Sequence, residues 1–176
     1  IDSNESLLEV ERKILEADII YVGGGNTKYM LDLWKGKNVD LSLKKAFERG
    51  KILAGLSAGS ICWFEYGHSD FQAFNTDSKW NYQIVQGLEL IKGIHCPHYN
   101  EDDRRIDFDN MMKEFNGVGI ALENNSAIVI KDNQYKIIKA NEQAKAYRVY
   151  NRNKVIIKEE LQEDFSPLSS LYKVMF

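Results

Sequence analysis

A serine flanked by small residues is the clearest chemical feature of the sequence. Residues 55–59 read GLSAG, and the apolar run Lys51–Leu56 that leads into them predicts a short buried strand. Ala58–Phe64 predicts the start of a helix, so Ser57 is expected at a sharp turn from strand to helix. The glycine-x-serine-x-glycine pattern is typical of nucleophile turns, because small neighbours avoid clashes where the serine backbone is strained. A glycine-rich turn without chemistry is the alternative.

A second glycine cluster lies upstream, where residues 22–27 read VGGGNT after the apolar segment 18–22. A dinucleotide-binding fingerprint would need a third glycine at Lys28, and the residue spacing of a phosphate-binding P-loop is also absent. We therefore expect the loop to supply one backbone donor for an oxyanion. The other donor would be an amide at the start of the helix after Ser57, because a tetrahedral intermediate needs donors that converge on one oxygen.

A serine nucleophile needs a base, and the sequence offers three histidines, at positions 68, 95 and 98. His98 is the best placed of them, because it follows Pro97 at the end of a predicted apolar strand. His95 lies inside that strand, and His68 lies in a polar loop. A hydrogen-bonded structural role is the alternative for each histidine. The HCPH segment matches no common zinc-binding spacing, so no metal site is predicted.

Two carboxylates compete to orient the histidine. Asp70 lies between Ser57 and His98, which is the chain order of the α/β-hydrolases. Glu123 ends a predicted strand, and the carboxyl ends of parallel strands meet at one edge of a sheet. Both candidates remain open at this point.

The elements expected around these residues alternate between helix and strand. Apolar spacing predicts a helix over Ser6–Ala17, and apolar runs predict buried strands at 18–22 and 51–56. Such alternation favours a parallel sheet covered by helices. Residues 66–83 are expected to form a long functional loop. The other expected elements are helices at Thr27–Leu33, Leu41–Arg49 and Glu101–Phe115, one or two strands within 84–99, and short strands at Gly117–Glu123, Ala127–Ile130, Tyr135–Lys139, Ala144–Tyr150 and Lys154–Ile157.

Composition narrows the class of protein. The 176 residues, of which 44% are apolar, suit a single domain. A net charge of −3 without a basic block disfavours a nucleic-acid partner. No apolar run approaches the roughly 18 residues of a membrane-spanning helix, so no membrane partner is expected. The two cysteines are too few for a disulfide framework and are expected to be buried thiols, which favours a cytoplasmic location.

Four motifs, in chain order, resemble those of one known family. YVGGGNT at 21–27, GLSAGS at 55–60, PHY at 97–99 and LENNSA at 122–127 are similar to successive motifs of the dipeptidase E (aspartyl dipeptidase) family of serine peptidases, to which cyanophycinase is related. The resemblance covers residues 20–130. It implies an α/β fold, namely a three-layer α/β/α sandwich with a mostly parallel central sheet similar to that of the class I glutamine amidotransferases.

The resemblance also implies roles for individual residues. The family's triad is Ser-His-Glu, which implies Ser57 as nucleophile, His98 as base and Glu123 as the residue that orients the base. The oxyanion would be held by the backbone amides of Gly25 and Ala58. Such a mechanism uses neither a metal nor an organic cofactor.

Substrate binding is expected at two further positions. Asp70 falls where members carry an important aspartate after the nucleophile turn, and Asn26 belongs to the first glycine motif. The expected partner is a small peptide, bound by a monomer or homodimer. An esterase or amidase with the same triad and a catalytically silent binding protein of the same fold are the alternative functions.

The resemblance also bears on the extent of the chain. Members have further strands and helices ahead of the helix that precedes YVGGGNT. We therefore expect the single domain, residues 1–176, to lack its N-terminal strand or strands.

Overall fold

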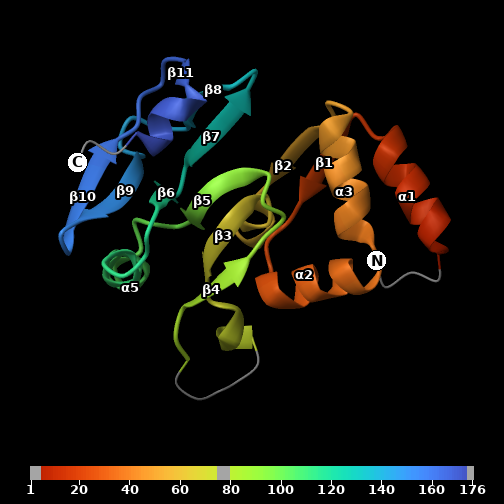
Figure 1. Cartoon of the computed structure of the whole chain (residues 1–176), viewed down its shortest axis with the longest axis horizontal. Coiled ribbons are helices and arrows are strands. Elements are labelled where there is room, and N and C mark those ends of the chain that lie inside the picture. The colour runs from red at the N-terminus through yellow and green to blue at the C-terminus, as the bar shows by residue number, and fades with distance from the viewer. Residues whose placement is uncertain (1–4, 75–79, 174–176) are drawn as a thin grey trace. The chain divides into compact units, whose positions relative to one another are not determined.

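The computed structural model describes residues 5–74 and 80–173. The chain forms two compact units, residues 1–91 and 92–176 (Figure 1). That the two make a single domain stays a prediction. The predicted alternation of helices and strands is present, which confirms the α/β class.

The N-terminal unit begins as the sequence predicts. Strands β1 and β2 pair in parallel, from Ile19 opposite Ile52 to Val22 opposite Gly55. Strands β3 and β4 form an antiparallel pair. The elements of this unit are α1 (Leu7–Glu16), β1 (Ile19–Val22), α2 (Thr27–Gly36), α3 (Val39–Glu48), β2 (Ile52–Gly55), α4 (Ala58–Ile61), β3 (Phe64–Ser69), the 3-10 helix η1 (Phe71–Phe74) and β4 (Gln83–Gln86).

The prediction that β1 and β2 are buried is wrong for one face of their sheet. Ile19 is 61% exposed and Ile52 is 59% exposed. Their neighbours Ile20 and Leu53 pack against the hydrophobic core instead. Because successive side chains of a strand point to opposite faces, a two-stranded sheet with a core on one side leaves alternate residues open.

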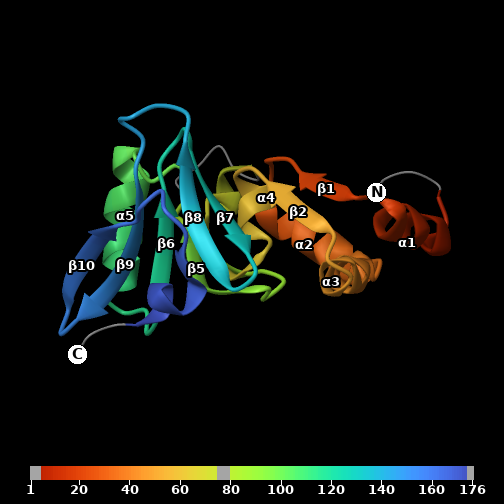
Figure 2. The ribbon, with the colours of Figure 1, turned by 90° about the horizontal axis from the view of Figure 1, so that it is seen from above.

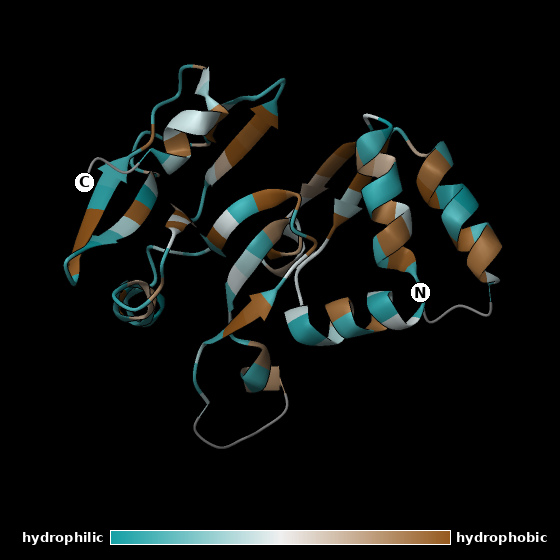
Figure 3. Cartoon of the chain, in the orientation of Figure 1, coloured by the Kyte–Doolittle hydropathy of each residue, from teal (hydrophilic) through white to brown (hydrophobic). Residues whose placement is uncertain are grey.

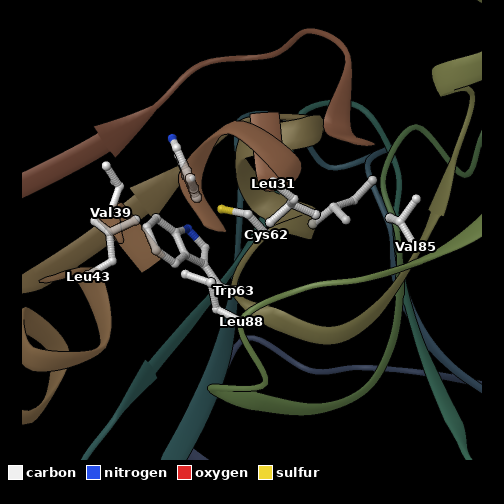
Figure 4. Close-up of a cluster of buried hydrophobic side chains, with 9 residues drawn as sticks. Leu31, Val39, Leu43, Cys62, Trp63, Val85 and Leu88 are labelled. Atoms are coloured by element: carbon white, nitrogen blue, oxygen red, sulfur yellow. The ribbon is translucent and has the colours of Figure 1, made fainter. Parts of the chain in front are cut away.

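The core of this unit lies between α2, α3 and the segment that follows α4. Trp63 packs against Trp34 with ring centroids 6.4 Å apart, and both side chains are buried. Figure 4 shows Trp63 among side chains that include Leu43 and Leu88. Trp63 stands two residues after α4, so this packing fixes the chain directly behind the GLSAG turn.

The segment predicted as a loop from residue 66 is partly strand. Strand β3 extends to Ser69, and His68 and Ser69 are fully buried. His68 stacks on Tyr82 with centroids 4.4 Å apart, so the prediction of a loop histidine is wrong. The side-chain partners of this segment come from separate elements: Tyr82 directly precedes β4, and the Ser69 hydroxyl donates to that of Thr27 in α2 at 3.0 Å. Residues 75–79 of the predicted loop lie outside the described residues.

The C-terminal unit is rich in strands, as predicted (Figure 2). Strands β5 and β6 pair in parallel, whereas β6–β9 and β9–β10 pair in antiparallel fashion. Strands β7, β8 and β11 form a separate antiparallel sheet, and β7 is apolar along most of its length (Figure 3). The elements are β5 (Ile91–Cys96), α5 (Asp102–Met112), β6 (Val118–Leu122), β7 (Ser126–Lys131), β8 (Gln134–Lys139), β9 (Ala146–Arg152), β10 (Val155–Glu160), β11 (Ser166–Pro167) and the 3-10 helix η2 (Leu168–Tyr172).

His95 is a structural residue of the β5–β6 pair. Its side chain is fully buried, and Nδ1 lies 2.8 Å from the carbonyl oxygen of Ile120. Because a carbonyl oxygen only accepts, Nδ1 carries the proton and donates. Burial lowers the pKa of His95 from 6.5 to about 4, so the ring is neutral near pH 7.

This burial predicts a loss of stability in mild acid. Below the unfolded-state pKa of 6.5 the unfolded chain binds a proton that the folded chain refuses until about pH 4. The free energy of unfolding should therefore fall as the pH drops through this window, by up to about 3 kcal/mol at about 1.4 kcal/mol per pH unit. Urea unfolding at pH 7, 6, 5 and 4.5 measures the slope. His95→Gln should flatten it, because the buried group that refuses the proton is removed. An unchanged slope in His95→Gln would contradict this account.

Candidate active site

Ser57 occupies the strained turn that the sequence predicts. It lies between β2 and α4 with φ 55° and ψ −118°. A residue with a Cβ atom rarely adopts this backbone conformation, and such strain persists only where the surroundings enforce it. The side chain is partly exposed. The serine is therefore presented at a turn and is not packed into the core.

The two glycines of GLSAG are required by close backbone contacts. A Cβ atom on Gly55 would lie 1.9 Å from the carbonyl oxygen of Gly59. A Cβ atom on Gly59 would lie 2.0 Å from the carbonyl oxygen of Val22. The Leu56 amide also donates to the Val22 oxygen at 3.1 Å. The turn is thus pressed against the end of β1, which accounts for Gly59, and is folded tightly on itself, which accounts for Gly55.

The first glycine cluster lies beside Ser57, as expected. A Cβ atom on Gly24 would lie 3.4 Å from the Cβ atom of Ser57, so Gly24 is the glycine directly next to it. Gly25 is exposed and has φ 144°, a conformation that favours glycine. Ala58 follows Ser57 as the first residue of α4. The assignment of the oxyanion donors to Gly25 and Ala58 stays a prediction.

The helix after Ser57 is shorter than predicted. It ends at Ile61 and does not reach Phe64. The carbonyl groups of the next residues pair outside the helix: Leu88 donates to Cys62 at 2.7 Å and Leu90 donates to Trp63 at 3.0 Å. These bonds draw the chain into β3 after one helical turn. Donation to an oxyanion must then depend on the local direction of the amides, because a single turn has little macrodipole.

The two predicted substrate residues lie on segments that are hydrogen-bonded together. Asn26 caps α2, with Oδ1 accepting the Tyr29 amide at 3.0 Å, and its Nδ2 donates to the Phe71 carbonyl at 3.3 Å. Phe71 directly follows Asp70, which is partly buried at the end of β3. The structure therefore gives Asn26 a capping role, which the sequence analysis missed. Substrate binding by Asn26 and Asp70 stays a prediction.

His98 stands two residues beyond the end of β5. Its backbone is left-handed, with φ 56°, and its side chain is 24% exposed. The ring Nδ1 lies 2.5 Å from Oδ1 of Asn124 and 4.0 Å from Oε1 of Glu101. The position of His98 after the end of β5 and the exposure of its side chain agree with the prediction that His98 is the histidine available for chemistry.

Glu123 makes a different hydrogen bond. Its Oε2 accepts the Lys145 amide at 2.9 Å, and its own amide donates to the Lys145 carbonyl at 3.0 Å. Asn124, the next residue of the LENNSA motif, is the one whose side chain reaches His98. Sequence reasoning missed Asn124. Its side-chain amide oxygen is able to accept a hydrogen bond from an imidazole N–H, and it directly follows Glu123, the residue that was chosen.

Other chemistries find little support among the described residues. Cys62 and Cys96 are buried free thiols, as predicted, and burial raises the pKa of both, so neither is a thiolate nucleophile near pH 7. Within residues 5–74 and 80–173, no three histidine, cysteine or carboxylate side chains cluster as metal ligands would. No helix in the same ranges is long and apolar enough to cross a membrane.

Comparison with known sequences shows the family. The model of peptidase family S51 matches residues 2–138, and the chain therefore belongs to this peptidase family. The resemblance found in the four motifs is confirmed. A Bacillus subtilis (strain 168) protein named uncharacterized peptidase YgaJ is 39% identical over 139 residues, which make up 77% of this chain and 57% of the relative. The chain thus spans less than two thirds of that relative's length.

Solved structures show the fold. A candidate peptidase E protein from Listeria monocytogenes EGD-e matches with a TM-score of 0.59 at 24% identity, over 78% of this chain and 67% of that one. A peptidase from an acI-B1 Actinobacterium matches with a TM-score of 0.65 at 16% identity, over 92% of this chain and 64% of that one. The chain has the α/β fold of these peptidases, as the sequence predicts.

The close contacts of the turn predict an asymmetric response to alanine. Gly59→Ala should destabilise the protein by about 1–3 kcal/mol or more, because the new methyl group would collide with the Val22 carbonyl. Gly23→Ala is the matched control, since a Cβ atom there meets nothing within 4 Å. Urea unfolding monitored by circular dichroism measures both variants. Equal stability of the two would show that the turn is not pressed against β1.

Proposed function

We propose that the chain carries the nucleophile and base of a serine-type hydrolase that cleaves dipeptides or short peptides through an acyl-enzyme. The observation that carries the proposal is the strained Ser57 turn, with the glycine loop directly beside it. Strain of this kind is retained where a side chain must be displayed for chemistry. Membership of peptidase family S51 supports the choice of an amide bond as substrate.

The proposed reaction has two halves. Ser57 Oγ attacks the scissile carbonyl carbon while His98 Nε2 takes the hydroxyl proton, and the amides of Gly25 and Ala58 hold the resulting oxyanion. Collapse of the tetrahedral intermediate breaks the C–N bond, and the amine leaves with the proton from His98. Water then attacks the acyl-enzyme with His98 again acting as base, which releases the acid and restores Ser57.

The proposed substrate is small and carries a free amino terminus. Asp70 lies at the end of β3 on a segment bonded to Asn26, and its carboxylate is a suitable partner for an ammonium group. The family resemblance to dipeptidase E supports the same choice. We further propose a cytoplasmic monomer or homodimer that uses no metal or organic cofactor.

Replacement of the nucleophile tests the mechanism. Ser57→Ala should keep the fold but lower turnover of a dipeptide panel by about 10³-fold or more, because no acyl-enzyme can form. A fluorophosphonate should label the wild type stoichiometrically at Ser57 and should not label the variant. Ser42→Ala in α3 is the matched control and should retain both activity and label.

Four outcomes would count against the proposal. Near-normal turnover in Ser57→Ala would exclude the covalent mechanism. Rapid turnover of simple esters or non-peptide amides with none of the dipeptides would favour the esterase or amidase alternative. Absence of both label and hydrolysis would favour a silent binding protein. Efficient digestion of casein would contradict the restriction to short peptides.

Asp70 should act on substrate affinity. Asp70→Asn should raise KM by about 10-fold for dipeptides with a free amino terminus, since one close ion pair is lost, and should change kcat little. N-acetylated dipeptides should show no such change. Asp32→Asn, at a 60% exposed aspartate of α2, is the control. If Asp70→Asn abolished kcat on every substrate, Asp70 would instead belong to the catalytic machinery.

A further inference from the structure

We infer that Asn124 is the residue that orients His98, in the place where a carboxylate was expected. Asn124 is a positioning residue, because it acts through the histidine and not on the substrate. The catalytic meaning of this inference rests on the proposed function, whereas the state of the His98 ring does not.

The contact itself defines the tautomer of His98. Its Nδ1 lies 2.5 Å from Oδ1 of Asn124. An amide oxygen only accepts hydrogen bonds, so Nδ1 must carry the proton and donate it. The other ring nitrogen, Nε2, then has a free lone pair. This is the tautomer that a general base needs in order to take a proton from a serine hydroxyl.

Two further hydrogen bonds, one between backbone groups and one to a side chain, hold together the segments that carry His98 and Asn124. The Tyr99 amide donates to the Leu122 carbonyl at 2.9 Å, and the Asn124 amide donates to Oδ1 of Asn100 at 2.8 Å. Tyr99 and Asn100 directly follow His98, and Leu122 lies two residues before Asn124. Three hydrogen bonds therefore join the loop after β5 to the turn after β6, which fixes the ring orientation before any substrate binds.

Glu123 is held on the other side of β6. Its amide and its Oε2 both bond to Lys145, which directly precedes β9. Strand β6 pairs with β9 along one edge and with β5, which precedes His98, along the other. The Glu123 carboxylate thus fastens the β6 turn to the β9 side. Glu123 therefore has a structural role, because it holds in place the turn that carries Asn124.

The charged group next to the His98 ring is Glu101. Its Oε1 lies 4.0 Å from His98 Nδ1, and its Oε2 lies 3.8 Å from Nε of Arg104. Glu101 is 51% exposed, so solvent screens its charge. Orientation therefore comes from a neutral amide, while the negative charge near the ring is shared with Arg104.

Nitrogen NMR of the histidine rings tests the inference without any activity. In ¹⁵N-histidine-labelled wild type near pH 8, His98 should give the pattern of an Nδ1–H ring. His95 is an internal standard, because its Nδ1 donates to the Ile120 carbonyl. Asn124→Ala should move His98 toward the Nε2–H form, which an unconstrained imidazole prefers. Asn124→Asp should keep the Nδ1–H form, since its carboxylate still accepts, and Glu123→Gln should leave the tautomer unchanged.

Kinetics of the same variants separate positioning from folding. Asn124→Ala should lower kcat by about 10²-fold with KM within about two-fold, and Asn124→Asp should recover most of the loss. The unfolding free energy should be equal in Asn124→Ala and Asn124→Asp. If both variants were inactive and unfolded, the tautomer of His98 in the wild type would test the inference by itself. An Nδ1–H ring would support it, and an Nε2–H ring would overturn it.

The inference and the proposed function fail in different ways. An Nε2–H ring in the wild type, or an Nδ1–H ring that survives in Asn124→Ala, would overturn the inference. A tautomer lost in Glu123→Gln but kept in Asn124→Ala would give the role to Glu123. A wild type that neither hydrolyses peptides nor reacts with a fluorophosphonate would overturn the proposed function, whatever the tautomer.

Discussion

The contact between the backbone of Gly59 and the carbonyl of Val22 is the constraint on which the Ser57 turn depends. The Val22 carbonyl oxygen lies too close to leave room for a Cβ atom at Gly59, and it also accepts a hydrogen bond from the Leu56 amide. Both contacts exist because β1 and β2 pair in parallel with Val22 opposite Gly55. The pairing brings the end of one strand over the turn that ends the other. Ser57 is held between them in a conformation that it would not adopt alone.

A related principle operates in the C-terminal unit. Strands β5 and β6 are parallel, so the residues that follow them emerge at the same edge of the sheet. His98 stands two residues past one strand end and Asn124 two residues past the other. Short hydrogen-bonded loops then bring an imidazole and an amide together. In the N-terminal unit the strands determine where Ser57 lies, and in the C-terminal unit they determine where His98 lies. The loops determine only the final direction of each side chain.

An amide beside His98 changes what the pair could contribute if His98 acts as the proposed base. A carboxylate would both fix the tautomer and stabilise the imidazolium, whereas an amide fixes the tautomer alone. Membership of peptidase family S51 identifies the family of the chain, but not the residue that orients His98. The chain also spans only 57% of the length of its Bacillus relative. The hydrogen bonds around His98 are therefore the more direct guide to how its ring is held.

The sequence alone predicted most of the elements, the GLSAG turn and the place of His98 after a strand end, because apolar periodicity and small-residue patterns report local backbone geometry. The role of His98 as base stays a prediction. The tertiary structure decided the rest. The helix after Ser57 stops after one turn, where the amides of Leu88 and Leu90 bond the carbonyl groups of Cys62 and Trp63, the two residues that follow it. Asn124 rather than Glu123 contacts His98, which lies 26 residues earlier in the chain. The register of β5 and β6 determines which of the two side chains faces His98. Such choices depend on partners distant in sequence, which no local pattern specifies.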